Sequence, residues 1–107
     1  MSKNQSCIEA CQQCIIDCQT CIAEMLGKAS SGDCPQCCIE CAEICELCVR
    51  TMARGGKFSA EICRLCAEVC DWCANQCEKE GHDHCKKCAQ SCRKCAEECR
   101  TMAGQAA

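Results

Sequence analysis

Apolar and polar positions alternate along this chain with the period of an α-helix. Cysteine supplies most of the regularly spaced apolar positions and recurs at alternating steps of three and four residues, which places it on one face of a helix. Four such stripes account for all 21 cysteines. The stripes are Cys7, Cys11, Cys14, Cys18 and Cys21; Cys34, Cys37, Cys38, Cys41, Cys45 and Cys48; Cys63, Cys66, Cys70, Cys73 and Cys77; and Cys85, Cys88, Cys92, Cys95 and Cys99.

Turn and capping residues separate the stripes and mark the ends of the predicted helices. The expected helices cover residues 3–26, 34–54, 60–80 and 84–103. Gly27 is placed to end the first helix in a left-handed conformation, and Gly81 to end the third. We expect Asp33 and Ser59 to cap the second and third helices, with Phe58 packing back onto the third.

The connections between the predicted helices are short, so consecutive helices should be antiparallel neighbours. The sequence therefore predicts an all-α fold, an up-down-up-down four-helix bundle with a cysteine-lined core. The first and last regularly spaced cysteines of each stripe are separated by about 21 Å at the helical rise per residue, so sulfur should line most of the bundle axis. A chain of 107 residues closes only one core, which predicts a single domain over residues 1–107.

Charge and hydropathy exclude several classes of partner. The formal net charge is −3 with mixed signs, which favours neither a nucleic-acid partner nor an anionic membrane surface. The first six residues are polar and unlike a secretory signal, and no segment is long and apolar enough to cross a bilayer. We therefore expect a cytoplasmic protein, whose reduced thiols favour metal binding over disulfides.

Cysteine also packs as a small apolar side chain, so the stripes could be core and nothing more. Leucine or isoleucine would fill these positions better and contribute about 1.5 to 3 kcal/mol per fully buried side chain. A core made almost wholly of cysteine gives up much of this packing energy, which argues against a purely structural role. Branched aliphatic residues are expected to flank the sulfur stripes and seal the sides of the bundle. They are Ile8, Ile15, Ile22, Ile62 and Val69.

The arrangement of the thiols discriminates between soft metals. Cys-x-x-Cys pairs such as Cys11 and Cys14 lie inside helices and are mixed with Cys-x-x-x-Cys pairs, which is unlike a discrete zinc or iron–sulfur site. One Cu(I) per thiolate leaves the filled core neutral, whereas each tetrathiolate zinc site carries a formal charge of minus two in a dry core. A metallothionein-like zinc or cadmium buffer stays an alternative. A thiol redox protein is another, although no Cys-x-x-Cys pair has the exposed helix N-terminus that lowers a thiol pKa.

These residues resemble one family, the bacterial copper storage proteins, over essentially the whole chain. The resemblance rests on Cys-x-x-x-Cys pairs and on the Gly-His-Asp-His-Cys segment before the last helix. These are Cys14/Cys18, Cys41/Cys45, Cys66/Cys70, Cys73/Cys77, Cys88/Cys92, Cys95/Cys99 and residues 81–85.

The resemblance implies a non-catalytic store and buffer of Cu(I) that protects against copper toxicity. If every cysteine is a ligand, about one Cu(I) binds per cysteine. The family's cytosolic branch and homotetrameric assembly are implied as well, with outward-facing Leu47, Leu65 and Trp72 as candidate contacts. A copper chaperone is a candidate partner. Cys37 lies just off the main stripe of its helix.

At one end of the predicted bundle, histidine and methionine side chains add potential copper ligands to the cysteine stripes. His82, His84 and Met25 are the expected metal-entry residues, because thioether and imidazole groups pass Cu(I) along without binding it as tightly as thiolates do. Cys34, Cys77 and Cys85 should lie beside them. The other end offers Met52, Met102 and Phe58 without histidine, which we interpret as a closed end, with a second entrance as the alternative.

Overall fold

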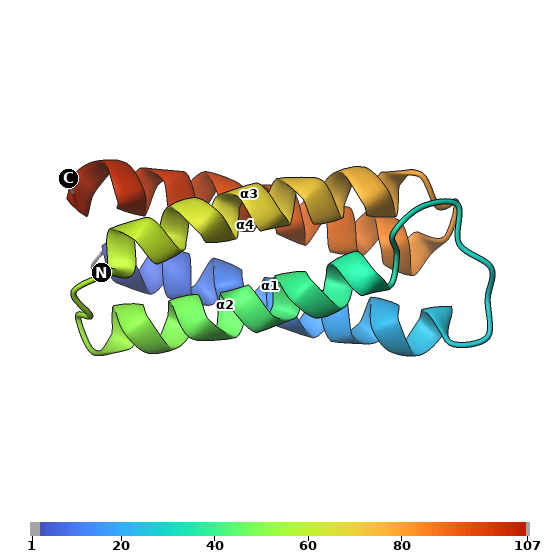
Figure 1. Ribbon diagram of the computed structural model, residues 1–107, viewed down its shortest axis with the longest axis horizontal. Coiled ribbons are helices and arrows are strands. Elements are labelled where there is room, and N and C mark those ends of the chain that lie inside the picture. The colour runs from blue at the N-terminus through green and yellow to red at the C-terminus, as the bar shows by residue number, and fades with distance from the viewer. Residues whose placement is uncertain (1–2, 107) are drawn as a thin grey trace.

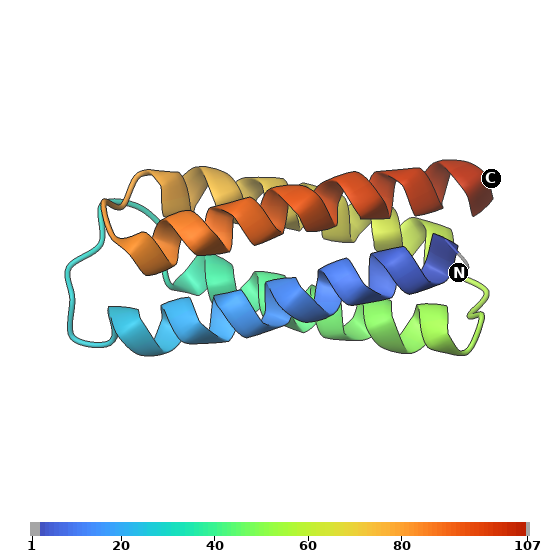
Figure 2. The same ribbon diagram turned by 180° about the vertical axis from the view of Figure 1, so that it is seen from behind.

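Four helices lie side by side along one axis in the computed structural model, which describes residues 3–106. Successive helices run in opposite directions (Figures 1 and 2), as the predicted up-down-up-down bundle requires, and the whole measures 41 × 20 × 18 Å. Each helix contacts its two neighbours around the bundle, including α1 with α4. The predicted fold class is therefore confirmed. The helices are α1 (Lys3–Met25), α2 (Gln36–Ala53), α3 (Ser59–Glu78) and α4 (Asp83–Ala106).

The predicted ends of α1 and α2 agree with the structure to within two residues, but one predicted cap is wrong. Gly27 adopts a φ of +80°, the left-handed conformation expected after α1. No side-chain hydrogen bond caps α2, so the prediction for Asp33 fails. Pro35 lacks one of the N–H groups that a capping carboxylate would bind. The backbone carbonyl of Asp33 instead accepts a hydrogen bond from the Cys37 N–H at 2.8 Å.

The cap predicted for α3 is also wrong. The Ser59 hydroxyl donates to the Gly56 carbonyl at 2.7 Å and lies 3.3 Å from the Thr51 hydroxyl, so it tightens the α2–α3 connection and does not cap the helix. Phe58 is 59% exposed and does not pack back onto α3. α3 ends at Glu78, before Gly81, and α4 runs past residue 103 to Ala106. A single glycine costs only about 1 kcal/mol inside a helix, so the helix continues through Gly104.

The core is made of sulfur and small side chains. Every cysteine of the four stripes is buried, and buried alanines fill positions beside them, which lets the helices approach closely. The flanking aliphatic residues pack against this core from partly buried positions, as predicted. The alanines are Ala42, Ala67, Ala74, Ala89 and Ala96, and the flanking residues include Ile8, Ile15, Ile22, Ile62 and Val69.

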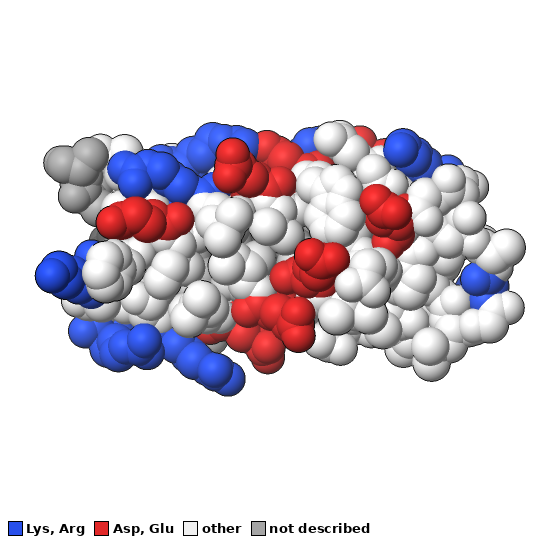
Figure 3. All heavy atoms as spheres, in the orientation of Figure 1, with Lys and Arg blue, Asp and Glu red and all other residues white. Residues whose placement is uncertain are grey.

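The surface is polar and mixed in charge, with some apolar side chains left outside. Leu47 and Leu65 are exposed, whereas Trp72 is partly buried against the core. None of the helices within residues 3–106 has the length and hydropathy needed to cross a bilayer. Lysine and arginine gather at the end of one face where the two chain termini lie, and uncharged side chains cover most of the opposite end (Figure 3).

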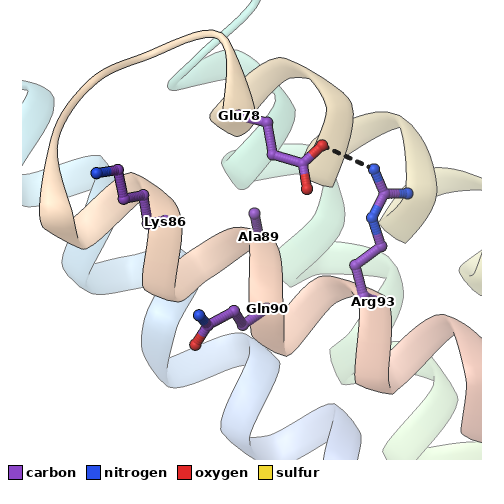
Figure 4. A pocket seen from close by; sticks show the side chains of 5 residues that line it. All are labelled: Glu78, Lys86, Ala89, Gln90 and Arg93. Carbon is purple, nitrogen blue, oxygen red and sulfur yellow. Dashed lines mark hydrogen bonds and ion pairs between the residues drawn. The ribbon is translucent and has the colours of Figure 1, made fainter.

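A surface hollow of about 460 Å³ lies between α3 and α4 (Figure 4). Arg93 donates to the Glu78 carboxylate at 2.9 Å and to Asp71 at 3.3 Å, which bridges the two helices along the rim of this hollow. Buried Ala89 forms part of its wall. The lining residues contain no sulfur, so the hollow is separate from the thiol core. They are Glu78, Lys86, Ala89, Gln90 and Arg93.

Candidate metal centre

The thiols of neighbouring helices meet along the bundle axis. Pairs from different helices lie as close as 3.4 Å between Sγ atoms for Cys11 and Cys95, and 3.5 Å for Cys41 and Cys70. Pairs one turn apart on the same helix lie slightly farther apart, as for Cys14 and Cys18 at 4.0 Å. All 21 cysteines are free thiols. Sulfur therefore forms a column within the bundle, which we call the thiol column.

Groups of four thiols recur along this column, each with its Sγ atoms within 4.8 Å of one another. Successive groups share members, so a metal site at one level uses some of the same sulfurs as the next level. The column is therefore a continuous lining and not a set of separate four-ligand sites. Five of these groups are Cys7/Cys11/Cys48/Cys99, Cys11/Cys45/Cys66/Cys95, Cys14/Cys41/Cys45/Cys70, Cys14/Cys18/Cys41/Cys92 and Cys18/Cys73/Cys88/Cys92.

The spacing of the sulfurs fits thiolate-bound metal ions. A metal–sulfur bond of about 2.3 Å places the sulfurs around one ion roughly 3.8 to 4.6 Å apart, from tetrahedral to linear coordination. The Sγ pairs of the column, 3.4 to 4.0 Å apart, need only small shifts to reach such distances. Distance alone therefore permits both zinc and Cu(I).

Charge separates the two metals. Among the described side chains, the buried polar or charged residues are Asp17, Thr51 and Glu80, and none of these is a cation. Several tetrathiolate zinc sites would each leave a formal charge of minus two without a buried counter-charge, which a low-dielectric core disfavours. Monovalent copper at one ion per thiolate leaves the same core neutral. The chemistry of this donor set therefore favours Cu(I).

Burial changes the proton affinity of the thiols at one end of the column. Removal from water raises the pKa of Cys34 above its ordinary value and raises the pKa of Cys85 to about 12. These two thiols are therefore protonated near neutral pH, and a metal ion that binds them releases protons. Hydrogen bonds, from Cys38 first and with a smaller contribution from His84, instead lower the pKa of Cys21 to about 6.

An imidazole joins the thiols at that end. His84 Nδ1 lies 3.4 Å from the Sγ atoms of both Cys21 and Cys85. Cys34 Sγ lies 3.7 Å from Cys21 Sγ, and the Met25 thioether lies 4.0 Å from Cys85 Sγ. We call these five residues the end cluster. Three thiols, one thioether and one imidazole nitrogen offer a mixed set of soft ligands.

The remaining residues predicted for this end lie around the cluster. The His82 ring stacks on the His84 ring, with centroids 5.1 Å apart and planes within 8°. Cys77 lies 3.6 Å from Cys38, and its thiol joins the column. Cys21 also belongs to this end although it was not among the residues predicted there, and its position one turn before Met25 is the signal that indicates it.

The other end of the column closes differently. Cys48 and Cys63 lie 3.4 Å apart there, and Cys7 and Cys99 lie 3.6 Å apart. Met52 is buried above them at 2% exposure, while Met102 is partly buried.

Cys37 lies away from the regular spacing of its stripe, as its position in the sequence indicates. Its thiol is buried and donates to the main-chain carbonyl of Cys73 at 3.9 Å. This contact with a backbone oxygen distinguishes Cys37 from cysteines such as Cys38 and Cys77, whose thiols contact each other.

The bundle and its thiol column together define a helical protein with a soft-metal-binding core. A family model described as copper storage protein matches residues 1–104. The chain belongs to the copper storage protein family. A comparison with curated protein sequences gives no significant match.

Solved structures resemble the chain over nearly its full length. A Cu(I)-bound copper storage protein is 41% identical, with a TM-score of 0.90 over 95% of this chain and 99% of that one. The metal-free copper storage protein 3 from Bacillus subtilis is 43% identical, with a TM-score of 0.87 over 92% and 97%. A cytosolic copper storage protein from Streptomyces lividans, in a copper-loading structure with five coppers, is 26% identical, with a TM-score of 0.88 over 95% and 92%.

Proposed function

We propose that this chain stores and buffers Cu(I) in its thiol column and thereby limits copper toxicity. The observation that carries the proposal is the continuous line of free, buried thiols with overlapping groups of possible ligands. The names of the structural relatives support Cu(I) as the stored ion, since one is described as Cu(I)-bound and another as holding five coppers. No catalytic step is part of this proposal.

Cysteine thiolates from all four helices are the ligands. Cu(I) accepts two or three sulfurs, so pairs across helices, such as Cys11 and Cys95, can each hold an ion together with pairs one turn apart, such as Cys14 and Cys18. Full use of the column gives about one Cu(I) per cysteine, or about 21 ions per chain. Each ion displaces a thiol proton on binding.

Copper enters and leaves at the end cluster under this proposal. The imidazole of His84 and the thioether of Met25 lie against the last thiols of the column, where they can transfer Cu(I) to Cys21 and Cys85. His82 stacks on His84 and is a further member of the path. Ligands of intermediate strength suit transfer, because the ion must leave them again for a thiolate.

The cellular setting follows from the relatives and the surface. We assign the protein to the cytosol because the relative from Streptomyces lividans is described as cytosolic. Exposed Leu47 and Leu65, with partly buried Trp72 on the same pair of helices, are the contacts we assign to a homotetramer. A copper chaperone is the candidate donor of the ion.

Parallel titrations of the reduced, metal-free protein test the stored ion. Additions of Cu(I) and of Zn(II) under anaerobic conditions should saturate near 21 and near five ions per chain respectively, since zinc requires about four thiolates per ion. A competing chelator should remove zinc far more readily than copper. Copper saturation near five ions per chain would contradict the proposal and support the zinc or cadmium buffer.

A further inference from the structure

The connection between α1 and α2, residues 26–35, covers the end of the bundle where the end cluster lies. It extends across that end and reaches the α3–α4 connection (Figures 1 and 2). Residues 26–33 are all exposed, including Leu26 at 74%, so this part of the loop has no apolar anchor in the core. Hydrogen bonds must therefore hold it in place.

Two side chains near the end of α3 supply those hydrogen bonds. The Glu80 carboxylate accepts from the Ser31 N–H at 3.0 Å and from the Ser30 hydroxyl at 3.2 Å. The Gln76 side-chain oxygen accepts from the Asp33 N–H at 2.9 Å. Glu80 is only 7% exposed although it is charged, so the loop covers the carboxylate that holds it.

The same loop carries one of the thiols of the end cluster. Cys34 precedes α2, which begins at Gln36, and its side chain is only 2% exposed. Its Sγ lies 3.7 Å from that of Cys21, which in turn lies 3.4 Å from His84 Nδ1. The position of the loop therefore decides whether Cys34 is within reach of an ion held by Cys21.

Gly32 shows how closely the loop follows α3. A Cβ atom added at this position would overlap the Gln76 side-chain oxygen, which accepts the hydrogen bond from the next residue, Asp33. A larger residue would displace the Gln76 amide from the loop side. Residue 32 therefore offers a way to weaken the contact without changing α3.

We propose that the 26–35 loop is a movable cover of the thiol column, and that its hydrogen bonds to Glu80 and Gln76 set the rate of Cu(I) passage through the end cluster. Opening the loop withdraws Cys34 from Cys21 and uncovers Met25 and His84. A few hydrogen bonds each contribute modestly to stability, so the loop can open while the helices stay intact. This inference rests on the proposed copper storage, and Glu80 and Gln76 act in it as positioning residues.

Loop opening can be measured without copper. Pulsed alkylation of the reduced, metal-free protein, followed by peptide mapping, gives a rate for each cysteine. Glu80→Ala removes the acceptor for two hydrogen bonds and should raise the alkylation rate of Cys34 about tenfold. Cys63 and Cys99 at the far end should keep their parental rates, and Glu80→Gln should recover most of the protection because it keeps one acceptor oxygen.

Asp17→Ala is the matched control. Asp17 is also a buried carboxylate, 4% exposed. It accepts from Gln13 one turn earlier on α1 and from Ser91 on α4, away from the loop. Its loss should leave Cys34 alkylation within about twofold of the parent, because no hydrogen bond of the loop depends on it. Equal acceleration at every cysteine in Glu80→Ala would show general loosening and overturn the proposal.

Copper transfer completes the test. Loaded Glu80→Ala should release Cu(I) to a competing chelator about tenfold faster than the parent with an unchanged number of ions bound. If Glu80→Ala does not fold, Gly32→Ala in an intact α3 should show the same direction of change. Full capacity with parental release rates would overturn the proposed cover, whereas failure of the parent to bind many Cu(I) ions would instead refute storage itself.

Discussion

The two ends of the bundle close the same thiol column with different chemistry. At one end, His84 and Met25 lie against thiols, and a long exposed loop held by hydrogen bonds extends across the bundle (Figure 1). At the other end, Met52 is buried and a short connection folds back on itself through the Ser59 hydroxyl, which donates to Gly56. The proposed function makes the first end, which we call the covered end, the entrance for copper. We call the second, where Met52 is buried, the sealed end.

Charge reinforces this difference. The short α2–α3 connection at the sealed end contains Arg54 and Lys57, and the face in Figure 3 shows lysine and arginine gathered at that end. The covered end also carries lysines, Lys28 in the 26–35 loop and Lys79 after α3, but Asp33 and Asp83 accompany them, so its charges are mixed. At the covered end the buried Glu80 carboxylate holds the loop that carries Cys34. A core of the same thiols and alanines along its length therefore differs at its two ends through only a few residues.

Truncation of Met52 should produce the largest effect, and it should be on stability. Met52→Ala removes a buried side chain from the sealed end and should lower the free energy of unfolding of the reduced, metal-free protein by about 2 to 5 kcal/mol. Urea denaturation followed by circular dichroism measures this loss. Met52→Leu should cost less than about 1.5 kcal/mol, since it keeps the volume. Slower copper uptake in Met52→Leu would assign the sealed end a role in entry.

Replacement of the entry residues should change rates. A variant with alanine at Met25, His82 and His84 should take up Cu(I), or lose it to a chelator, about tenfold more slowly, which corresponds to roughly 1.4 kcal/mol of barrier. Its capacity should stay within about two ions of the parent, because the thiol column is intact. Stopped-flow measurement with a coloured chelator gives both values.

The matched control changes the other end. Leucine at both Met52 and Met102 removes the thioethers there and should leave the rates of copper uptake and release unchanged. If the Met25, His82 and His84 variant kept parental rates of copper uptake and release while the Met52 and Met102 variant became slower, the entrance would lie at the other end.

Removal of a single thiol at either end should lower the number of bound Cu(I) ions equally but should affect the rate of copper release differently. Cys34→Ser and Cys63→Ser should each lower the saturating number of Cu(I) ions by about one, since each removes one thiolate. Only Cys34→Ser should change the release rate, because Cys34 belongs to the end cluster. Mass determination of the loaded proteins checks the capacity, and equal rate changes in the two variants would count against a single entrance.

The smallest effect is expected from the removal of copper, which should leave the secondary structure unchanged. Neutral thiols, alanines and flanking aliphatic residues form an apolar core without metal, so the reduced metal-free protein should keep its helical circular dichroism spectrum. The metal-free relative from Bacillus subtilis has the same fold. A random-coil spectrum before copper addition would instead make the metal a folding ligand.

Local patterns were sufficient to predict the fold and the column. The spacing of cysteines predicted four helices, and Gly27 marked the end of α1 correctly, because helix periodicity and a left-handed glycine are properties of a short stretch of chain. The caps assigned to Asp33 and Ser59 were wrong. The Asp33 N–H binds Gln76, which is distant in sequence and meets it only in the folded bundle. Ser59 instead turns back to the nearby Gly56 carbonyl, a competing local contact that the capping pattern does not distinguish.

The end cluster was predictable only in part for the same reason. Antiparallel topology predicted that Met25, Cys34, His84 and Cys85 share one end, and the structure brings them together with Cys21. Nothing in the sequence assigned a role to Glu80, because its function depends on a loop fifty residues earlier in the chain. Residues that hold a ligand-bearing loop have no local signature.

The central claim is that the whole thiol column, from one end to the other, is a single Cu(I) store. A crystal structure of the fully loaded protein with anomalous scattering recorded at the copper edge tests it most directly. The account predicts copper peaks along the entire axis, from the level of Cys7 and Cys99 to that of Cys21 and Cys85, each bound by two or three sulfurs. About five isolated peaks, each surrounded by four sulfurs and separated by metal-free thiols, would contradict it.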